Sequence, residues 1–219
     1  MGFKTTIVLI RHGMTQGNKE KRYIGITDET LLPESVRELA TKRDGMAASL
    51  RYRMNTKCYV SPLQRCRQTA ESIFPELEQV IVQDFKECNF GLFENKNYEE
   101  LNGNPIYQQF IDSGGQTAFP DGEDQDSFCA RVNTAFEVLV RDFLGEQEIR
   151  FEQPSNQETM DPLCIVAHGG TIMSILSQYA EDKKPFYEWM LGNGCYYKGA
   201  LFYDDESGKI EIKQISKYQ

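Results

Sequence analysis

The stretch TTIVLIRHG, residues 5–13, begins as a continuous apolar and β-branched run and ends abruptly in Arg11, His12 and Gly13. Because both faces of such a run are apolar, it predicts a strand that is buried on both sides. Strands of this kind occur in parallel sheets covered by helices on both faces. This short stretch therefore indicates an α/β fold with a polar, glycine-containing turn at the end of its first strand.

Outward from this strand, the chain alternates strand-like and helix-like segments. Further strands are predicted at KCYV (57–60), QVIVQ (79–83) and PLCIVA (162–167), with a hairpin over 195–215 that turns at residues 206–208. Helices are predicted over 33–54, 63–73, 123–144 and 171–180, and a polar loop over 145–161. The alternation predicts one domain, residues 1–219, with three α/β/α layers around a mostly parallel sheet.

One predicted helix and one irregular segment refine this picture. The helix over 123–144 carries an apolar stripe formed by Phe128, Val132, Phe136, Leu139, Val140 and Phe143. Residues 90–126 are instead rich in Gly, Asn, Asp and Tyr, with one amphipathic stretch near 97–113. We interpret the part at about 93–120 as a small inserted lid.

Composition narrows the classes of function. The chain has 24 basic and 33 acidic residues, a net charge of −9, which argues against nucleic acid as the main ligand. We expect no membrane association, since no apolar run is long enough to span a bilayer and the lipidation-like MGFKTT start has no second membrane signal. Six scattered cysteines without a CxxC pair, and no visible secretory signal, indicate a cytoplasmic protein. The oligomeric state stays open.

The two histidines of the chain occupy matching places. Both His12 and His168 follow an apolar strand directly and precede glycine, in IVLI-RHG and CIVA-HGG. Ligands of open parallel sheets collect at the carboxyl ends of the strands. We therefore expect the two imidazoles, far apart in sequence, to converge on one site.

Several neighbouring residues suit a phosphate group. Gly13, Gly169 and Gly170 allow close approach of the backbone, and the last two stand where a helix begins, which favours an anion. Arg11 offers a planar fork of donors. Arg65 and Arg67 lie two positions apart on one helix, so only one of them can face the site.

Other chemistries lack their usual residue patterns. Two histidines without HxH or HExxH spacing make a zinc site improbable, so we expect no metal or other cofactor. There is no GxSxG elbow and no GxxxxGK[ST] phosphate loop. A histidine nucleophile is the reading that remains.

An ordered set of motifs resembles the histidine phosphatase superfamily, most closely its phosphoglycerate-mutase-like branch. The motifs are RHGMTQGN, YIGITDETL, SPLQRCRQTAE, KECNFGLFEN, PDGE and VAHGG, in the expected order from Ile7 to about Ile175. YIGITD and FGLFEN further resemble α-ribazole-phosphate phosphatases. Departures at Met14, Leu32, Ser35 and Leu92-Phe93 leave substrate choice open.

The resemblance implies a role for each matched residue. His12 would be the nucleophile, Glu87 the acid that protonates the leaving oxygen, and His168 the group that stabilises transferred charge. The phosphoryl oxygens would be bound by Arg11, Asn18, Arg65 and Gly169.

The expected function is hydrolysis of a small phosphorylated metabolite, α-ribazole phosphate among the candidates, through a phosphohistidine. Two alternatives stay open. The first is a phosphoglycerate mutase, although the segment after Glu87 has no arginine, unlike that of the mutases. The second is a non-catalytic module that binds a phosphate ligand on the same fold.

Overall fold

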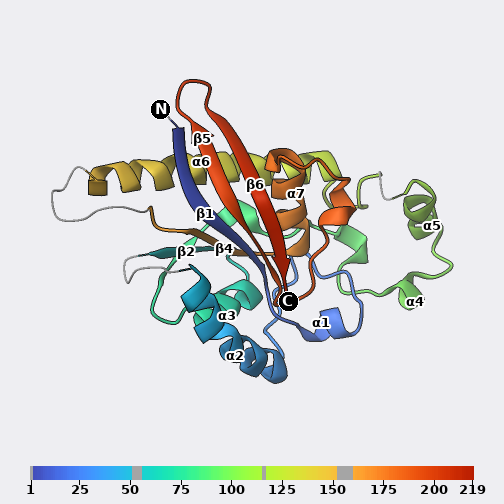
Figure 1. The fold of residues 1–219 in the computed structure, drawn as a ribbon. Coiled ribbons are helices and arrows are strands. Elements are labelled where there is room, and N and C mark those ends of the chain that lie inside the picture. The colour runs from blue at the N-terminus through green and yellow to red at the C-terminus, as the bar shows by residue number, and fades with distance from the viewer. Residues whose placement is uncertain (1, 51–55, 115–116, 152–159) are drawn as a thin grey trace.

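The computed structural model describes residues 2–50, 56–114, 117–151 and 160–219. Its described part contains one six-stranded sheet, in the order β3-β2-β4-β1-β5-β6 (Figure 1). The strands are β1 (Gly2–Arg11), β2 (Lys57–Val60), β3 (Glu78–Ile81), β4 (Leu163–Ala167), β5 (Tyr196–Asp204) and β6 (Lys209–Tyr218). The first four are mutually parallel, and β5 and β6 form an antiparallel hairpin beside β1.

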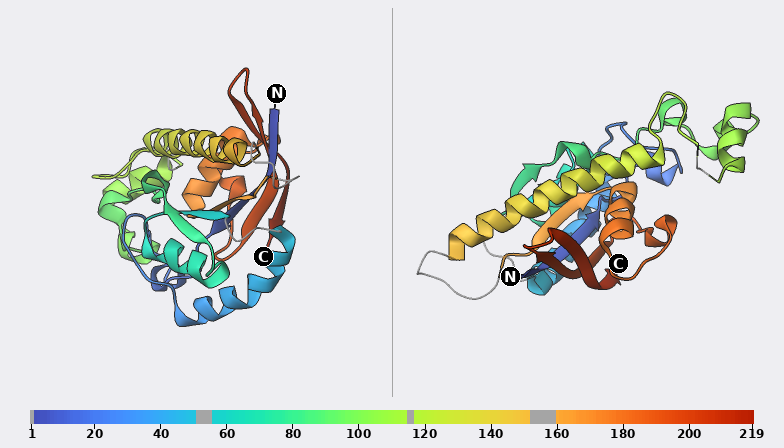
Figure 2. Two further views of the ribbon diagram at one scale, coloured as in Figure 1. Left: turned by 90° about the vertical axis from the view of Figure 1, so that its left-hand side faces the viewer. Right: turned by 90° about the horizontal axis from the view of Figure 1, so that it is seen from above.

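Helices cover both faces of this sheet. On one face lie α2 (Pro33–Leu50) and α3 (Gln64–Ile73), and on the other α6 (Gln125–Phe151) and α7 (Gly169–Tyr179) (Figure 2). The apolar run of β1 supplies both layers, since successive side chains point to opposite faces. Ile7 and Leu9 pack with α6 and α7, whereas Val8 and Ile10 pack with α2 and α3. The predicted three-layer α/β/α fold with a mostly parallel sheet is confirmed.

The predicted stripe on α6 is confirmed, but its predicted end is wrong. All six stripe residues are buried in the core. The helix continues past 144 to Phe151, so the first part of the predicted 145–161 loop is helical. Gly145 costs only about 1 kcal/mol in a helix interior, and burial of the adjacent Leu144 outweighs it. Buried Gln147 also accepts a hydrogen bond from the Asp161 amide.

Other boundaries shift by smaller amounts. The helix predicted over 33–54 is observed over Pro33–Leu50, and residues 51–55 lie outside the described residues, as do 152–159 of the predicted loop. The helix predicted from Thr171 begins two residues earlier, at Gly169. The strand predicted over 79–83 is shorter, because residues Gln83–Phe85 turn into a 3-10 helix. The C-terminal hairpin turns where predicted.

The segment 93–120 builds a small core of its own. It contains α4 (Tyr98–Leu101) and α5 (Pro105–Asp112), with Phe93, Leu101 and Phe110 buried together. In Figures 1 and 2 these helices extend from one end of the molecule, away from the sheet. The short α1 (Gln16–Lys19) follows β1, and two further 3-10 helices, Gly91–Phe93 and Phe186–Trp189, border the same end. In the described portion of the chain, no helix is both long and apolar enough to cross a membrane.

Candidate active site

The two histidines lie side by side at the carboxyl edge of the sheet. β1 and β4 are adjacent parallel strands with Arg11 in register with Ala167, so each strand delivers its following histidine to the same place. The His12 amide donates to the Ala167 carbonyl at 3.0 Å. The two imidazole centroids are 5.2 Å apart at an interplanar angle of 63°. The convergence expected from the matching sequence contexts is therefore observed.

The surroundings of His12 determine its protonation. Burial, together with the positive charges of Arg65 and Arg11, holds its pKa well below the ordinary value of 6.5. The imidazole is therefore neutral near pH 7. Its Nδ1 lies 2.7 Å from the carbonyl oxygen of Gly13, which can only accept, so Nδ1 carries the single ring proton. The Nε2 lone pair is then available for attack.

His168 is held on both ring nitrogens. Nε of Arg65 donates to its Nδ1 at 3.2 Å, and its Nε2 lies 2.7 Å from the hydroxyl oxygen of Ser61. Because Nδ1 accepts, the neutral ring carries its proton on Nε2 and donates it to Ser61. Burial and the nearby charge of Arg65 likewise hold the pKa of His168 well below 6.5. Both imidazoles are thus neutral and fixed in orientation.

Of the two arginines on α3, only Arg65 faces the site. Arg65 is fully buried, and its two terminal nitrogens each donate to a backbone carbonyl at 2.7 Å, those of Thr27 and Gly25. Arg67 is exposed on the opposite face of the helix. The prediction that only one of the pair can face the site is confirmed.

Arg11 carries the second guanidinium group of the site, and it makes fewer hydrogen bonds than Arg65. Its Nη1 donates to the Leu191 carbonyl at 2.5 Å, whereas its buried Nε has no hydrogen-bond partner within the described chain. Burial lowers the pKa of Arg11, and the nearby Glu87 charge offsets this in part. An unpaired guanidinium donor close to a second guanidinium favours an anion at this point. Gly169 begins α7 next to the Arg11 guanidinium, so the positive end of that helix dipole adds to the same field.

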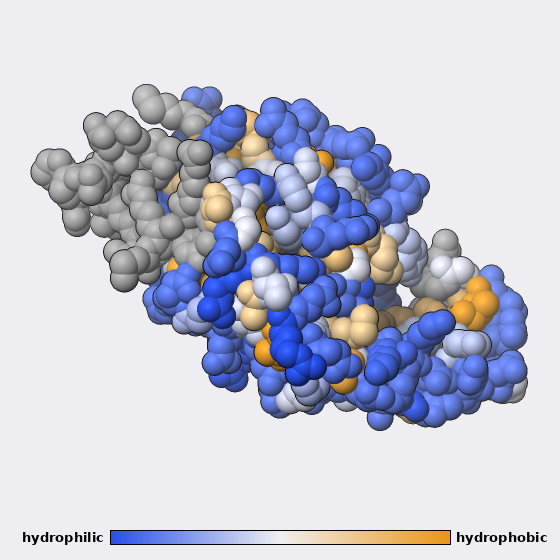
Figure 3. Space-filling view, turned by 60° about the horizontal axis from the view of Figure 1, so that its bottom comes forward, coloured by the Kyte–Doolittle hydropathy of each residue, from blue (hydrophilic) through white to orange (hydrophobic). Residues whose placement is uncertain are grey.

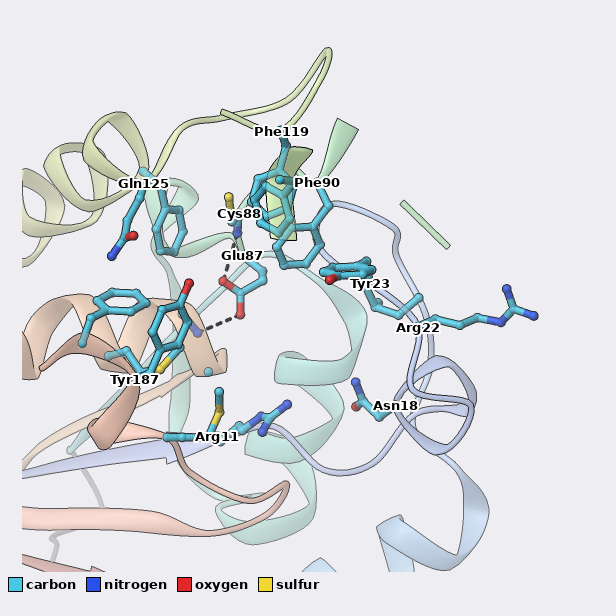
Figure 4. Close-up of a pocket in the computed structure, with 18 of the residues that line it drawn as sticks. Arg11, Asn18, Arg22, Tyr23, Glu87, Cys88, Phe90, Phe119, Gln125 and Tyr187 are labelled. Atoms are coloured by element: carbon cyan, nitrogen blue, oxygen red, sulfur yellow. Dashed lines mark hydrogen bonds between the residues drawn. The ribbon is translucent and has the colours of Figure 1, made fainter. Parts of the chain in front are cut away.

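Glu87 is buried and lies across the cavity from Arg11 (Figure 4). Its Oε2 accepts a hydrogen bond from the Gly170 amide at 2.9 Å, and its Oε1 accepts one from the Cys88 amide at 3.0 Å. A side chain at position 170 would overlap the Glu87 carboxyl group, so the glycine is required for this approach. The Phe128 ring lies against the same point. Glu87 is therefore a carboxyl group that two backbone amides hold in position beside an aromatic ring.

The two other carboxylates of this region are occupied elsewhere. Glu94 accepts hydrogen bonds from the amides of Gly25, Ile26 and Thr27, from the Thr27 hydroxyl, and from the amide of Phe90. Glu123 forms an ion pair with Arg131 at 2.9 Å and accepts from the Asn89 amide. Both tie backbone segments together, whereas Glu87 lines the cavity.

Sequence reasoning missed the loop 191–195, which supports the end of β1. The side-chain amide of Asn193 donates to the carbonyls of His12 and Gly13 and, at 2.9 Å, to Oδ1 of Asn18. Asn18, in turn, accepts from the Thr15 amide and lines the cavity. The only signal in the sequence is the Asn193-Gly194 pair, which predicts a turn but not its partner.

A cavity of about 550 Å³ opens above these groups. Arg11, Asn18, Glu87, Gly169 and Gly170 reach it at one end, and most of the remaining wall is aromatic or apolar. His12 and Arg65 lie buried beneath it. The space-filling view shows a hollow beside the end of the molecule that carries α4 and α5, with apolar atoms around it (Figure 3).

This fold and geometry define an α/β protein that gathers two histidines, two arginines and a glutamate at the carboxyl edge of its sheet. A family model described as the histidine phosphatase superfamily (branch 1) matches residues 7–211. The chain therefore belongs to the histidine phosphatase superfamily, branch 1.

Individual relatives agree with this assignment. The chain is 28% identical to a broad-specificity phosphatase of Saccharomyces cerevisiae over 176 residues, which covers 78% of this chain and 68% of the yeast protein. It is 29% identical over 138 residues to the Escherichia coli protein "Probable phosphoglycerate mutase GpmB", covering 60% of this chain and 61% of that protein.

Among solved structures, the α-ribazole phosphatase of Shigella flexneri has the same fold, with a TM-score of 0.72 at 20% identity over 95% of this chain and 94% of that one. The motif-based prediction of a histidine-type phosphatase is confirmed at the level of the family.

Proposed function

We propose that this protein is a phosphomonoesterase that hydrolyses a small phosphorylated metabolite through a phosphohistidine on His12. One observation carries the proposal: His12 is neutral, its Nδ1 proton is held by the Gly13 carbonyl, and its buried ring lies beside the charges of Arg65 and Arg11. Phosphoryl transfer requires mainly positioning and compensation of charge on the equatorial oxygens, which this arrangement supplies.

In the first step, Nε2 of His12 attacks phosphorus and the bond from phosphorus to the ester oxygen breaks. The leaving alkoxide takes a proton from the Glu87 carboxyl group and departs as an alcohol. Arg11 and Arg65 bind the phosphoryl oxygens, assisted by Asn18 and the amide of Gly169. His168 stabilises the charge in transit by turning its Nε2 proton from Ser61 to a phosphoryl oxygen, while Arg65 continues to hold its Nδ1.

In the second step, the Glu87 carboxylate takes a proton from water, and the resulting hydroxide attacks phosphorus. The bond from phosphorus to Nε2 breaks, which releases inorganic phosphate and restores neutral His12 and protonated Glu87. Every charge in this scheme is balanced by residues of the chain, so we propose that the enzyme works without a metal ion or other cofactor.

Hydrolysis is preferred over mutase chemistry for two reasons. The segment 88–103, directly after Glu87, contains no arginine. The cavity-lining Arg22 forms ion pairs with Glu20 and Glu100, so its positive charge is already compensated and does not favour a second anionic group. α-Ribazole phosphate is a substrate to test, on the resemblance of the YIGITD and FGLFEN motifs.

Two further assignments belong to this proposal. Residues 93–120 act as a lid within a single domain, supported by their separate small core and by the attachment of Glu94 to residues 25–27. The enzyme works in the cytoplasm, supported by six cysteines that all occur as free thiols.

The covalent intermediate provides the test. A brief incubation of the wild type with a ³²P-labelled monoester, quenched in base, should leave acid-labile, base-stable label on His12. The His12→Ala variant should show neither label nor turnover, since no other side chain in the pocket can replace the nucleophile. Label on serine or cysteine, or turnover without any label, would contradict the covalent mechanism.

A further inference from the structure

The wall of the cavity beyond the phosphate end is mainly aromatic. Tyr23, Phe90 and Phe119 stack edge to face with centroid distances of 4.9–6.3 Å, on the side of the proposed lid. Opposite them, Tyr187 and Met190 line the cavity with exposed fractions of 57% and 47%. Large apolar side chains left exposed around a concave site indicate that a ligand covers them.

The described part of this wall has no unpaired cationic side chain, apart from Arg11, that could bind a second negative charge. Beyond Arg11, the one cation among the described lining residues is Arg22. Its guanidinium donates to Glu20, to both oxygens of Glu100 and to the Asn95 carbonyl. In Figure 4 its side chain runs away from Arg11 and Glu87. Gln125, Tyr23 and Tyr187, which also line the cavity, are polar but uncharged.

We infer that the substrate of this site is a phosphate monoester whose alcohol part carries a flat apolar or aromatic group and no second anionic group. The inference rests on the proposed phosphatase function and adds the substrate class to it. The phosphoryl group lies over His12 between the two arginines. The apolar group lies between the stacked rings near Phe90 and the exposed pair Tyr187 and Met190.

The physical reason is the balance between burial and desolvation. A ring that enters this cavity removes apolar surface from water on the ligand and on the exposed wall at once. A carboxylate or second phosphate placed there would lose its hydration without gaining a free cation. The site therefore selects for an apolar alcohol part and against phosphorylated acids and bisphosphates.

Three phosphate esters of primary alcohols test this selectivity: propyl phosphate, 3-phenylpropyl phosphate and 3-phosphoglycerate. Because each releases a primary alcohol, the comparison reports on binding of the alcohol part and not on the ease with which the alcohol leaves. We expect kcat/KM of the wild type to be about 10- to 100-fold higher for 3-phenylpropyl phosphate than for propyl phosphate, and lowest for 3-phosphoglycerate. Equal values for the two alkyl esters, or a preference for 3-phosphoglycerate, would overturn the inference while the phosphatase function stands.

Two variants locate the selectivity. Tyr187→Ala should reduce the ratio of kcat/KM for the phenyl ester to kcat/KM for propyl phosphate by about 3- to 10-fold, since the exposed Tyr187 ring lines the cavity. Tyr98→Ala is the matched control, because Tyr98 is equally exposed, at 56%, but does not line the cavity. An equal effect of both variants would contradict the placement of the ring.

A binding measurement separates this inference from the proposed function. Titration calorimetry with the non-hydrolysable 3-phenylpropylphosphonate and propylphosphonate does not depend on turnover. Tighter binding of the phenyl compound, lost in Tyr187→Ala, would support the inference even if no ester were hydrolysed. Equal binding would reject it, whatever the activity.

Discussion

Glu87 illustrates how single residues set the chemistry of this site. Its two oxygens are fixed by the amides of Gly170 and Cys88, and the Phe128 ring lies beside it. The proposed mechanism makes this carboxyl group the proton donor and the neutral His12 the nucleophile. The roles of nucleophile and acid can therefore be separated by experiment.

Replacing Glu87 by Gln keeps the shape of the side chain and removes its proton. An alkyl phosphate has a poor leaving group that must be protonated, so its phosphorylation step should slow by roughly 10²–10⁴-fold. An aryl phosphate such as p-nitrophenyl phosphate leaves as a stabilised anion, and its phosphorylation step should slow much less. Pre-steady-state bursts with each substrate measure this step apart from the water step, in which Glu87 also acts.

Equal slowing of both bursts would assign Glu87 a binding or structural role. Glu123→Gln is the control carboxylate, since Glu123 is held by Arg131 and should not distinguish the two substrates. A selective loss in that variant instead would move the acid to Glu123.

At the level of elements, the turn at residues 25–27 connects the proposed lid to the proposed phosphate site. The Glu94 carboxylate accepts hydrogen bonds from the backbone amides of this turn. The Arg65 guanidinium donates hydrogen bonds to the carbonyls of Gly25 and Thr27 in the same turn. Gly25 has no room for a side chain, because a Cβ there would overlap the Cys88 carbonyl. Glu94 of the proposed lid and the buried Arg65 are thus hydrogen-bonded to the same turn.

Glu94→Gln should therefore affect catalysis from outside the pocket. The amide nitrogen of Gln would meet backbone donors where a carboxylate oxygen now accepts, so the turn and Arg65 should shift. A misplacement on the order of 1 Å costs up to about 10²-fold in rate. We expect kcat/KM to fall by about that factor at a temperature where circular dichroism reports a folded protein.

Glu99→Gln is the matched control for this prediction. Glu99 is an exposed carboxylate of α4, and within the described residues its side chain accepts a hydrogen bond only from the neighbouring Tyr98 hydroxyl. Its replacement should leave kcat/KM within about 2-fold, a surface effect. An unchanged rate in Glu94→Gln would show that the turn does not position Arg65.

The whole molecule concentrates positive charge in one place. The chain carries a net charge of −9, yet a fully buried Arg65 and a partly buried Arg11 lie beside the two histidines. Each guanidinium lies within the electrostatic reach of the other, and burial weakens the screening by water. A bound anion relieves this repulsion, so ligand binding should report on the stability of the fold.

Inorganic phosphate should therefore raise the melting temperature. At a concentration of 100 times its Kd the stabilisation is about 2.7 kcal/mol. For a domain of this size that corresponds to a shift of about 5–10 °C. Differential scanning fluorimetry with and without EDTA measures the shift, which should not change on chelation because the proposed site holds phosphate without a metal.

Two arginine variants test whether this shift in melting temperature arises from phosphate bound at the proposed site. Arg11→Met should lose most of the stabilisation by phosphate, whereas the exposed Arg67→Met should keep it. A shift that EDTA abolishes and Mg²⁺ restores would place a metal in the site and contradict the metal-free proposal.

The sequence by itself determined the layers of the fold and the location of the site. Three local patterns carry this information: the apolar run of β1, the apolar stripe on α6 and the two strand-histidine-glycine junctions. Each shows within a few residues which side chains are buried or where a strand ends. Parallel strands must end at one edge, so the meeting of His12 and His168 follows from those patterns. The prediction of Glu87 as a site residue depends on the resemblance of its motif to a family, because nothing local distinguishes it from other glutamates.

Tertiary structure alone decided what surrounds these residues. The bond from Arg11 to the Leu191 carbonyl joins positions 180 apart, and that between Ser61 and His168 joins positions 107 apart. Neither partner carries a local signal, because a backbone carbonyl or a serine hydroxyl looks the same in sequence wherever it lies. The aromatic cavity and the pairing of Arg22 with Glu100 likewise arise only when distant segments pack, since selectivity depends on which side chains remain unpartnered after folding.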